Sequence, residues 1–505
     1  MKPHVYFIGI ITAFIFSFCQ GIQETSEEAP KMNVLFIAVD DLRNELNCYG
    51  SSHIHSPNFD RLASEGTIFN NAYCMQAVCA PSRNSMMTGL RPDAIGIYDL
   101  YTFFRKKIPN VTTLPQHFKK HGYHSEGMGK IYHTGHGNQD DSLSWSVPFW
   151  KPVKEIAKLQ KITRGDTVGL ERDYPNIENK KLPWYRSGTA EEDMTDAMVA
   201  KHAVQRLKEL KDSTFFLAVG FVKPHLPFVA PKKYWDLYAP EKIEIPPTNP
   251  PEEMPEIALN TFGELRKYHG IQAEGLLEED QSRNLIHGYY ACVSYIDAQL
   301  GLLLDALKEN GLEENTIVVL WGDHGWKLGD YGSWCKHTNF EMDTRAPLFI
   351  KVPGMESHGN NTKALAEFID VYPTLCDLAG LPAPEHLQGT SLVPILKNPL
   401  NAVKEVAFSQ YPRGKSLGYD RKNEIMGYSI RNRQYRFTRW QLYEKPDSVV
   451  ASELYDLSNG RNAERNLALD PDYKQEVQRL NQIMDEELAR HQEEENRMAD
   501  LLGIK

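Results

Sequence analysis

The sequence of 505 residues contains few cysteines, no excess of positive charge and no long apolar run after its first twenty residues. Its seven cysteines form no Cys-x-x-Cys pair and no zinc-ligand spacing, and they are too sparse for a disulfide framework. The 56 basic and 67 acidic residues give a net charge of −11, which excludes a surface that coats nucleic acid or another polyanion. An acidic protein that acts on a polyanion must concentrate its positive charge in one place.

The first residues have the pattern of an export signal. Lys2 precedes an uncharged apolar run at 5–18, which is shorter than the roughly 20 residues that span a bilayer and fits a signal peptide. We expect a signal peptide over 1–21 and a linker over 22–32. Lipid attachment at Cys19, as in a bacterial lipoprotein, and a buried N-terminal strand are the alternatives. The prediction is an exported protein, periplasmic if bacterial and lysosomal or secreted if eukaryotic.

Three apolar runs, at 33–39, 214–220 and 316–321, end directly in polar residues. Continuous rather than alternating hydrophobicity indicates strands that are buried on both faces, as in a parallel sheet. Helical patterns lie between these runs, at 58–65 and 286–310. The alternation predicts an α/β fold with a mostly parallel sheet. Binding sites in such sheets lie beyond the carboxyl ends of the strands, so the polar residues after each run are the first candidates.

The pattern changes after residue 400. Short alternating segments there predict an antiparallel sheet, at 406–411, 426–431 and 435–440. A charged helix follows, with one apolar side that we interpret as a packing face, a partner-binding face being the alternative: Val477, Leu480, Met484 and Leu488. We therefore expect a larger α/β domain over 33–400, which carries the site, and a smaller α+β domain over 401–505.

The most informative stretch is Cys79-Ala80-Pro81-Ser82-Arg83. A cysteine just before a helix that begins with proline lies where the helix N-terminus stabilises negative charge. Arg83, one turn later, would add to this effect. By itself this pattern indicates an activated thiol, with a buried inert thiol as the alternative.

Two acidic clusters follow predicted core strands, Asp40-Asp41 after the first run and Asp323-His324 after the third. Adjacent carboxylates repel each other, and a hard divalent cation is the usual way to hold them together. A single Asp pair is more often a helix cap or a turn. Two such clusters at the carboxyl ends of core strands favour a metal site.

The stretch from Cys79 to Arg83, followed by Thr88-Gly89, closely resembles the C-x-P-S-R and T-G signature of the type I, formylglycine-dependent sulfatases. In that family, a formylglycine-generating enzyme oxidises the cysteine to formylglycine (3-oxoalanine) during biosynthesis. The resemblance implies an alkaline-phosphatase-like fold. It also implies that one hydroxyl of the hydrated Cys79 aldehyde attacks the sulfur of a sulfate ester, and that the other expels sulfate.

The resemblance also implies one calcium ion per chain, held by Asp40, Asp41, modified Cys79, Asp323 and His324. Many members of the family have asparagine at the last of these positions, and histidine is a less usual calcium ligand than an oxygen donor. The resemblance therefore extends the two acidic clusters into a complete ligand set.

Three further stretches match family motifs: Gly129 to His133, Lys223 to Phe228, and Trp334 to His337. By resemblance, Lys130 and Lys336 hold sulfate oxygens, and Arg83 with His133 orients and deprotonates the hydrated aldehyde. His225 would protonate the leaving alcohol, a role that needs a group titrating near neutrality.

Over 33–467 the resemblance is nearest to the iduronate-2-sulfatase branch of the family. It implies exo-acting removal of a 2-O-sulfate from a terminal iduronate or 4,5-unsaturated uronate of heparan or chondroitin/dermatan fragments, with Arg105 as a candidate for substrate binding. The insertion at 150–190 departs from the family and would border the pocket. The alternatives are a sulfatase for an amino-sugar or alkyl sulfate, a phosphoester hydrolase, and a non-catalytic glycan-binding protein if Cys79 stays unmodified. We expect a monomer that binds sulfated oligosaccharide and no nucleic acid.

Overall fold

The structure is a computed structural model, and it describes residues 1, 31–152, 175–177, 180–260, 262–355, 359–413, 425–443, 445–460 and 463–503. The chain divides into two units, Met1–Lys31 and Met32–Lys505, and the fold below is that of the second. Apart from Met1, the predicted signal peptide with Cys19 and the linker up to residue 30 lie outside the described residues. No described helix combines the length and apolarity needed to cross a bilayer.

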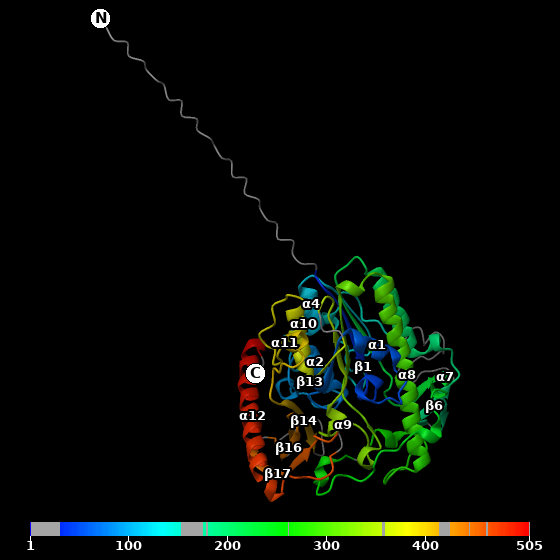
Figure 1. The fold of residues 1–505 in the computed structure, drawn as a ribbon, viewed down its shortest axis with the longest axis vertical. Coiled ribbons are helices and arrows are strands. Elements are labelled where there is room, and N and C mark those ends of the chain that lie inside the picture. The colour runs from blue at the N-terminus through cyan, green and yellow to red at the C-terminus, as the bar shows by residue number, and fades with distance from the viewer. Residues whose placement is uncertain are drawn as a thin grey trace. The chain divides into compact units, whose positions relative to one another are not determined.

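A seven-stranded sheet forms the centre of the second unit (Figure 1). Its strands, in spatial order, are β13 (Asn360–Glu367), β2 (Thr67–Tyr73), β12 (Leu348–Lys351), β9 (Thr316–Gly322), β1 (Asn33–Val39), β7 (Phe215–Phe221) and β3 (His124–Gly129). Strand β12 pairs antiparallel with both of its neighbours, whereas the other neighbouring strands pair in parallel. The predicted α/β fold with a mostly parallel sheet is confirmed.

Strand β1 has apolar residues on both faces because each face packs against a layer of helices. Leu35 and Ile37 belong to the core of one face, and Phe36 and Ala38 to the core of the other. The first face is covered by α1 (Pro57–Glu65), α6 (Thr195–Glu209) and α8 (Glu279–Glu309). The second is covered by α2 (Cys79–Thr88), α4 (Leu114–Lys120), α10 (Val371–Leu378) and α11 (Val393–Lys397).

A separate four-stranded antiparallel sheet follows in the chain, with strands β14 (Ala407–Arg413), β15 (Ile425–Arg431), β16 (Tyr435–Leu442) and β17 (Lys445–Asp456). Helix α12 (Lys474–Leu502) packs on it through Leu480 and Met484, so the predicted packing face is confirmed. The domain boundary at residue 400 stays a prediction, because residues 32–505 form one compact unit.

The other short α-helices of the described residues are α3 (Pro92–Ile95), α7 (Lys232–Trp235) and α9 (Glu341–Thr344). Three small sheets pair β4 (Asn176–Ile177) with β5 (Lys180–Lys181), β6 (Trp184–Ser187) with β8 (Phe228–Pro231), and β10 (Lys327–Leu328) with β11 (Trp334–Cys335). No disulfide bond joins any of the cysteines that the structure describes.

Two glycines allow the ends of β3 and β7 to approach each other. A Cβ atom on Gly129 would lie 2.0 Å from the carbonyl oxygen of Gly220, and one on Gly220 would lie 2.2 Å from that of Lys130. Gly129 also has a φ of +75°, which favours glycine. The close approach fixes the backbone of Lys130 beside β7, where its amide donates a hydrogen bond of 2.9 Å to the Gly220 carbonyl.

Candidate active site

Polar residues follow the carboxyl ends of four neighbouring parallel strands, in the spatial order β9, β1, β7 and β3. Asp323 follows β9, Asp40 follows β1, and Lys130 follows β3, while His225 lies in the loop after β7. Because these strands are adjacent and parallel, the four residues lie along one edge of the sheet, where α/β proteins place their binding sites.

Arg83 joins three of these strand ends. Its Nε donates to Asp323 Oδ2 at 2.9 Å, and its Nη2 donates to Asp40 Oδ1 at 2.8 Å. Its Nη1 donates to the carbonyl oxygens of Lys130 and Ile131. Arg83 and both carboxylates are fully buried, so the guanidinium is enclosed in a network of charged partners.

Cys79 is the first residue of α2, and its Sγ lies 3.3 Å from Nε2 of His324. Burial, together with the charge of Asp40, raises the pKa of the Cys79 thiol well above its usual value, although Lys336 and Lys130 act in the opposite direction. The unmodified side chain is therefore held as a thiol, which is a weak nucleophile. For this form a buried, inert thiol, the alternative to an activated one, is therefore favoured, because burial outweighs the nearby cations.

Among the residues that the structure describes, two groups of donor atoms could hold a metal ion, and in each group the atoms lie within 4.8 Å of one another. Together they comprise the five predicted ligands and one further residue: Asp40, Asp41, Cys79, Asp323, His324 and His225. His324 Nε2 lies 3.4 Å from Asp41 Oδ1 and 3.6 Å from Asp323 Oδ2. The structure thus brings all predicted ligands together around Cys79.

The charges in this cluster suit a divalent cation. Burial raises the pKa of Asp41 well above its usual value, and the charges of Asp40 and Glu264 add to the rise against the effect of Lys336. At Asp40, burial acts in the same direction, but Lys130 and Arg83 outweigh it and hold the pKa well below its usual value. Adjacent buried carboxylates, one of which has a raised pKa because of its negative neighbours, are oxygen donors that Ca²⁺ would stabilise in their charged form.

Two lysines contact the neighbouring carboxylates of Asp40 and Asp41. The ammonium group of Lys130 pairs with Asp40. Lys336 Nζ donates to Asp41 Oδ1 at 2.9 Å and to Oδ2 at 3.1 Å. The two predicted sulfate-binding cations therefore lie beside the predicted metal ligands.

His225 is oriented by its own loop and by Glu264. Its Nδ1 donates to the Leu226 carbonyl, which turns Nε2 toward Glu264 Oε1 at 3.4 Å. Glu264 Oε2 also lies 3.2 Å from Lys336 Nζ. The sequence analysis missed Glu264, because it lies in an irregular loop with no motif and meets these partners only in the folded chain.

His133 is buried, and neither of its ring nitrogens has a hydrogen-bond partner. Burial, with the charge of Lys130, lowers the pKa of His133 to about 3. A bound ligand can supply the hydrogen-bond partner that this buried imidazole lacks in the free protein.

Arg105 is the one predicted site residue that the structure does not bring into this cluster. Its guanidinium donates to the Asp141 carboxylate at 3.0 and 2.7 Å and to Gln116 Oε1 at 2.9 Å. These bonds tie its loop to the start of α4, so its donors serve the fold rather than the site.

Comparison with known proteins identifies the family. The family model described as Sulfatase matches residues 32–381. The chain is 34% identical over 514 residues to iduronate 2-sulfatase of Mus musculus, covering 87% of this chain and 92% of that protein. The chain belongs to the sulfatase family. It is accordingly a sulfuric ester hydrolase, as the Cys79 motif predicted.

Further comparisons agree with the family, and one with the fold. A sulfatase of Formosa agariphila is 31% identical over 473 residues, covering 92% of this chain and 88% of that protein. The model described as N-sulphoglucosamine sulphohydrolase, C-terminal, matches residues 329–492. A phosphonate monoester hydrolase from Silicibacter pomeroyi superposes with a TM-score of 0.74 at 21% identity, covering 91% of this chain and 96% of that one, which confirms the alkaline-phosphatase-like fold.

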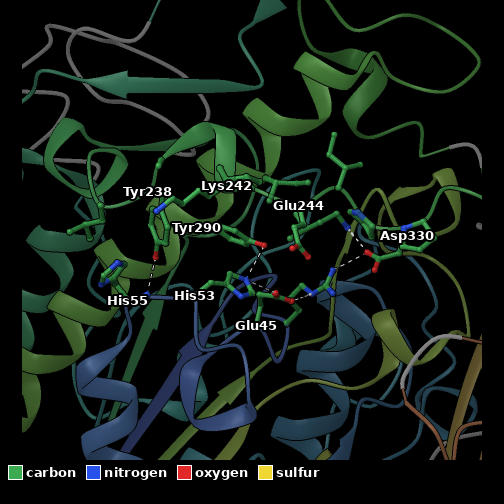
Figure 2. A pocket seen from close by; sticks show the side chains of 17 residues that line it. Glu45, His53, His55, Tyr238, Lys242, Glu244, Tyr290 and Asp330 are labelled. Atoms are coloured by element: carbon green, nitrogen blue, oxygen red, sulfur yellow. Dashed lines mark hydrogen bonds and ion pairs between the residues drawn. The ribbon is translucent and has the colours of Figure 1, made fainter.

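Two cavities lie near the carboxyl end of the sulfatase sheet. One, of about 450 Å³, is lined by Lys130, His133 and His225 of the cluster. The other, of about 470 Å³, is shown in Figure 2, and none of the predicted site residues is among the described residues that line it.

Several charged groups of the second cavity pair with each other. Arg43 Nη1 donates to Asp330 Oδ2 at 2.9 Å, and His53 Nε2 lies 3.1 Å from Glu45 Oε1 (Figure 2). The first cavity is therefore the one that leads to the reactive cluster.

Proposed function

We propose that this sulfatase removes the 2-O-sulfate from a terminal uronic acid, iduronate or its 4,5-unsaturated counterpart, at the end of heparan or chondroitin/dermatan fragments. Hydrolysis of sulfate esters follows from the family. The finer specificity is supported by one observation, the similarity to iduronate 2-sulfatase over 87% of this chain.

Cys79 is the proposed nucleophile after oxidation to formylglycine by a formylglycine-generating enzyme. The hydrated aldehyde supplies one hydroxyl that attacks sulfur and a second whose collapse releases sulfate, which a serine hydroxyl could not do. Its buried place at the start of α2, beside His324, supports this role, because the unmodified thiol is held protonated there.

The other residues hold the ester and manage protons. Lys130 and Lys336, on either side of the carboxylate pair, bind the sulfate oxygens as point charges. His225 would donate a proton from Nε2 to the leaving alcohol as an imidazolium, because its Nδ1–H already donates to the Leu226 carbonyl. Burial and the charges of Lys130 and Lys336 lower the pKa of His225 to about 3, so this role requires the negative charge of the bound ester to raise that pKa. Arg83 holds the two carboxylates in place, and His133 accepts a proton from the hydrated aldehyde.

Calcium is the proposed cofactor, and it would supply positive charge to the sulfate oxygens. Asp40, Asp41, Asp323, His324 and modified Cys79 would hold it. Removal of calcium with EGTA should abolish most sulfate release and lower Tm by a few degrees, since a metal present at 100 times its Kd stabilises a protein by about 2.7 kcal/mol. Added calcium should restore both.

Asp323→Ala should lose this response to calcium, whereas Asp305→Ala, an exposed carboxylate that pairs with Arg61, should keep it. Full activity and an unchanged Tm in protein shown by elemental analysis to be metal-free would contradict the calcium assignment.

A panel of disaccharides that differ in sulfate position and in saturation of the terminal uronate tests the substrate. We expect the highest kcat/KM for the terminal uronate 2-O-sulfate, measured as released sulfate. The second candidate is an N-sulfated glucosamine, favoured by the match of residues 329–492 to the N-sulphoglucosamine sulphohydrolase model. Faster release from an N-sulfate or a 6-O-sulfate would overturn the 2-O assignment.

We further propose that the protein is exported, that it is a monomer, and that it has a boundary between two domains near residue 400. Export is supported by the apolar run at 5–18, and the boundary by the separate sheet that begins at Ala407. Periplasmic location would follow in a bacterium, and lysosomal or secreted location in a eukaryote.

A further inference from the structure

The cavity of about 450 Å³ beside the reactive cluster carries an excess of positive charge. Among the described residues that line it, there are five lysines and one carboxylate: Lys130, Lys151, Lys180, Lys181, Lys267 and Glu264. Glu264 already pairs with Lys336 at 3.2 Å. Although the chain has a net charge of −11, the described lining of this cavity is positively charged.

Lys151 is held next to the sulfate-binding end of β3. The amide of Trp150 donates to the Gly127 carbonyl at 3.0 Å, and the amide of Gly129 donates to the Trp150 carbonyl at 3.1 Å. Lys151 Nζ donates to Thr134 Oγ1 at 2.8 Å. The backbone just before this lysine is therefore hydrogen-bonded to the end of β3, the strand that Lys130 follows.

Lys180 and Lys181 form β5, and the next strand, β6, pairs in parallel with β8 just after the His225 loop. The amide of Phe228 donates to the Pro183 carbonyl at 2.9 Å, which closes this pairing. The segment that carries the lysine pair is thus attached to the segment that carries His225.

Lys267 belongs to the loop that also carries Glu264. That loop is tied to β5, because the amide of His269 donates to the Lys181 carbonyl at 2.9 Å. Three separate segments therefore present lysines to one cavity, and each is hydrogen-bonded to a part of the site or to another of these segments.

His133 provides an independent sign that a ligand enters here. It lines the same cavity, is 9% exposed, and has no hydrogen-bond partner at either ring nitrogen. Buried polar groups in folded proteins are nearly always paired, so an unpaired one facing a cavity points to a polar ligand.

We propose that Lys151, Lys180, Lys181 and Lys267 form a second anion subsite, which holds an anionic group of the substrate other than the sulfate being removed. The group is a carboxylate or a second sulfate, since an ammonium group binds either as a point charge. The scissile sulfate binds at Lys130 and Lys336, so the four further lysines serve another group. The inference rests on the proposed function, because it takes the substrate to be a sulfated sugar.

The test compares the Lys180→Ala/Lys181→Ala and Lys151→Ala/Lys267→Ala double variants with Lys242→Ala. Lys242 is the matched control, because it is exposed and lines the other cavity (Figure 2). Each protein is assayed on an aryl sulfate, which carries one anionic group, and on a 2-O-sulfated uronate disaccharide. Both double variants should lower the ratio of kcat/KM for the disaccharide over the aryl sulfate by about tenfold or more, mainly through KM.

Two altered disaccharides identify the group. If reducing the uronate carboxyl to an alcohol abolishes the difference between variant and wild type, the subsite holds the carboxylate. If removing the sulfate of the second sugar abolishes it, the subsite holds that sulfate. An unchanged ratio in both double variants, with Tm as in the wild type, would overturn the subsite.

Failure of the proposed 2-O specificity can be distinguished from failure of the second anion subsite. If the wild type releases sulfate from another position instead, the 2-O assignment is wrong, and the same lysine comparison is made on that substrate. Competitive inhibition of aryl sulfate hydrolysis by a sulfated disaccharide gives a second readout, in which the inhibition constant should rise about tenfold in the double variants but not in Lys242→Ala.

Discussion

Replacement of Cys79 by alanine is expected to lower kcat for sulfate release by roughly 10⁴-fold or more, because it removes the group that becomes the nucleophile. The variant should still fold, since Cys79 contributes a single small buried side chain at the start of α2. The measurement is kcat on an aryl sulfate together with Tm.

Two further variants sharpen this result. Cys79→Ser should give at most one turnover, because a sulfated serine has no second hydroxyl with which to expel sulfate. Cys376→Ala, another buried cysteine in the core formed with α10, is the matched control and should keep kcat. Activity of Cys79→Ala within tenfold of the wild type would contradict the proposed nucleophile.

Replacement of Arg83 by alanine should both destabilise the protein and abolish activity. Arg83 is fully buried between Asp40 and Asp323, so its loss leaves two buried carboxylates without their partner. Breaking a buried ion pair in this way costs about 3–5 kcal/mol. Denaturant unfolding of the calcium-free protein should show this loss, and sulfate release should fall to background.

Arg83→Lys separates charge from shape. A lysine keeps the charge but cannot bond two carboxylates and two carbonyl groups at once, so it should recover part of the stability and little of the activity. Arg61→Ala, which breaks an exposed ion pair with Asp305, should cost about 0–1 kcal/mol. An Arg83→Ala protein as stable and active as Arg61→Ala would show that the buried network has no role.

The sequence was sufficient to predict three interior strands of the sheet, β1, β7 and β9, but not the interior strands β2 and β12. The apolar run at 33–39 coincides with β1 because both faces of this strand are covered by helices, which leaves no polar alternation. Strand β3 was not predicted, since it lies at the edge of the sheet and its residues, His-Ser-Glu-Gly-Met-Gly, include no continuous apolar run. Helix α8 begins at Glu279, earlier than predicted, because its first six residues, up to Asn284, are polar and show no apolar periodicity.

The predicted site could be assembled because its residues follow strands that are adjacent in the sheet. Asp40, Lys130, His225 and Asp323 come from four such strand ends, and their contacts follow from the order β9-β1-β7-β3. Glu264 could not be predicted, because its contacts with His225 and Lys336 depend on the path of a loop that has no regular pattern.

Arg105 illustrates the limit of carrying a role from a motif. The sequence placed this arginine near the pocket, but Asp141 and Gln116 take up its donors. The opposite holds for the lysines of the proposed second anion subsite, Lys151, Lys180, Lys181 and Lys267. In the sequence, each of these lysines looks like an ordinary surface charge. Their common role could not be predicted, because it depends on three segments that meet at one cavity only in the folded chain.

Mass spectrometry of the peptide that contains Cys79, from protein purified in active form, tests directly whether Cys79 becomes the formylglycine nucleophile. We expect residue 79 to carry the mass of formylglycine, and we expect the modified fraction to rise in proportion to kcat across preparations. Full sulfatase activity in protein whose residue 79 is entirely unmodified cysteine would contradict it.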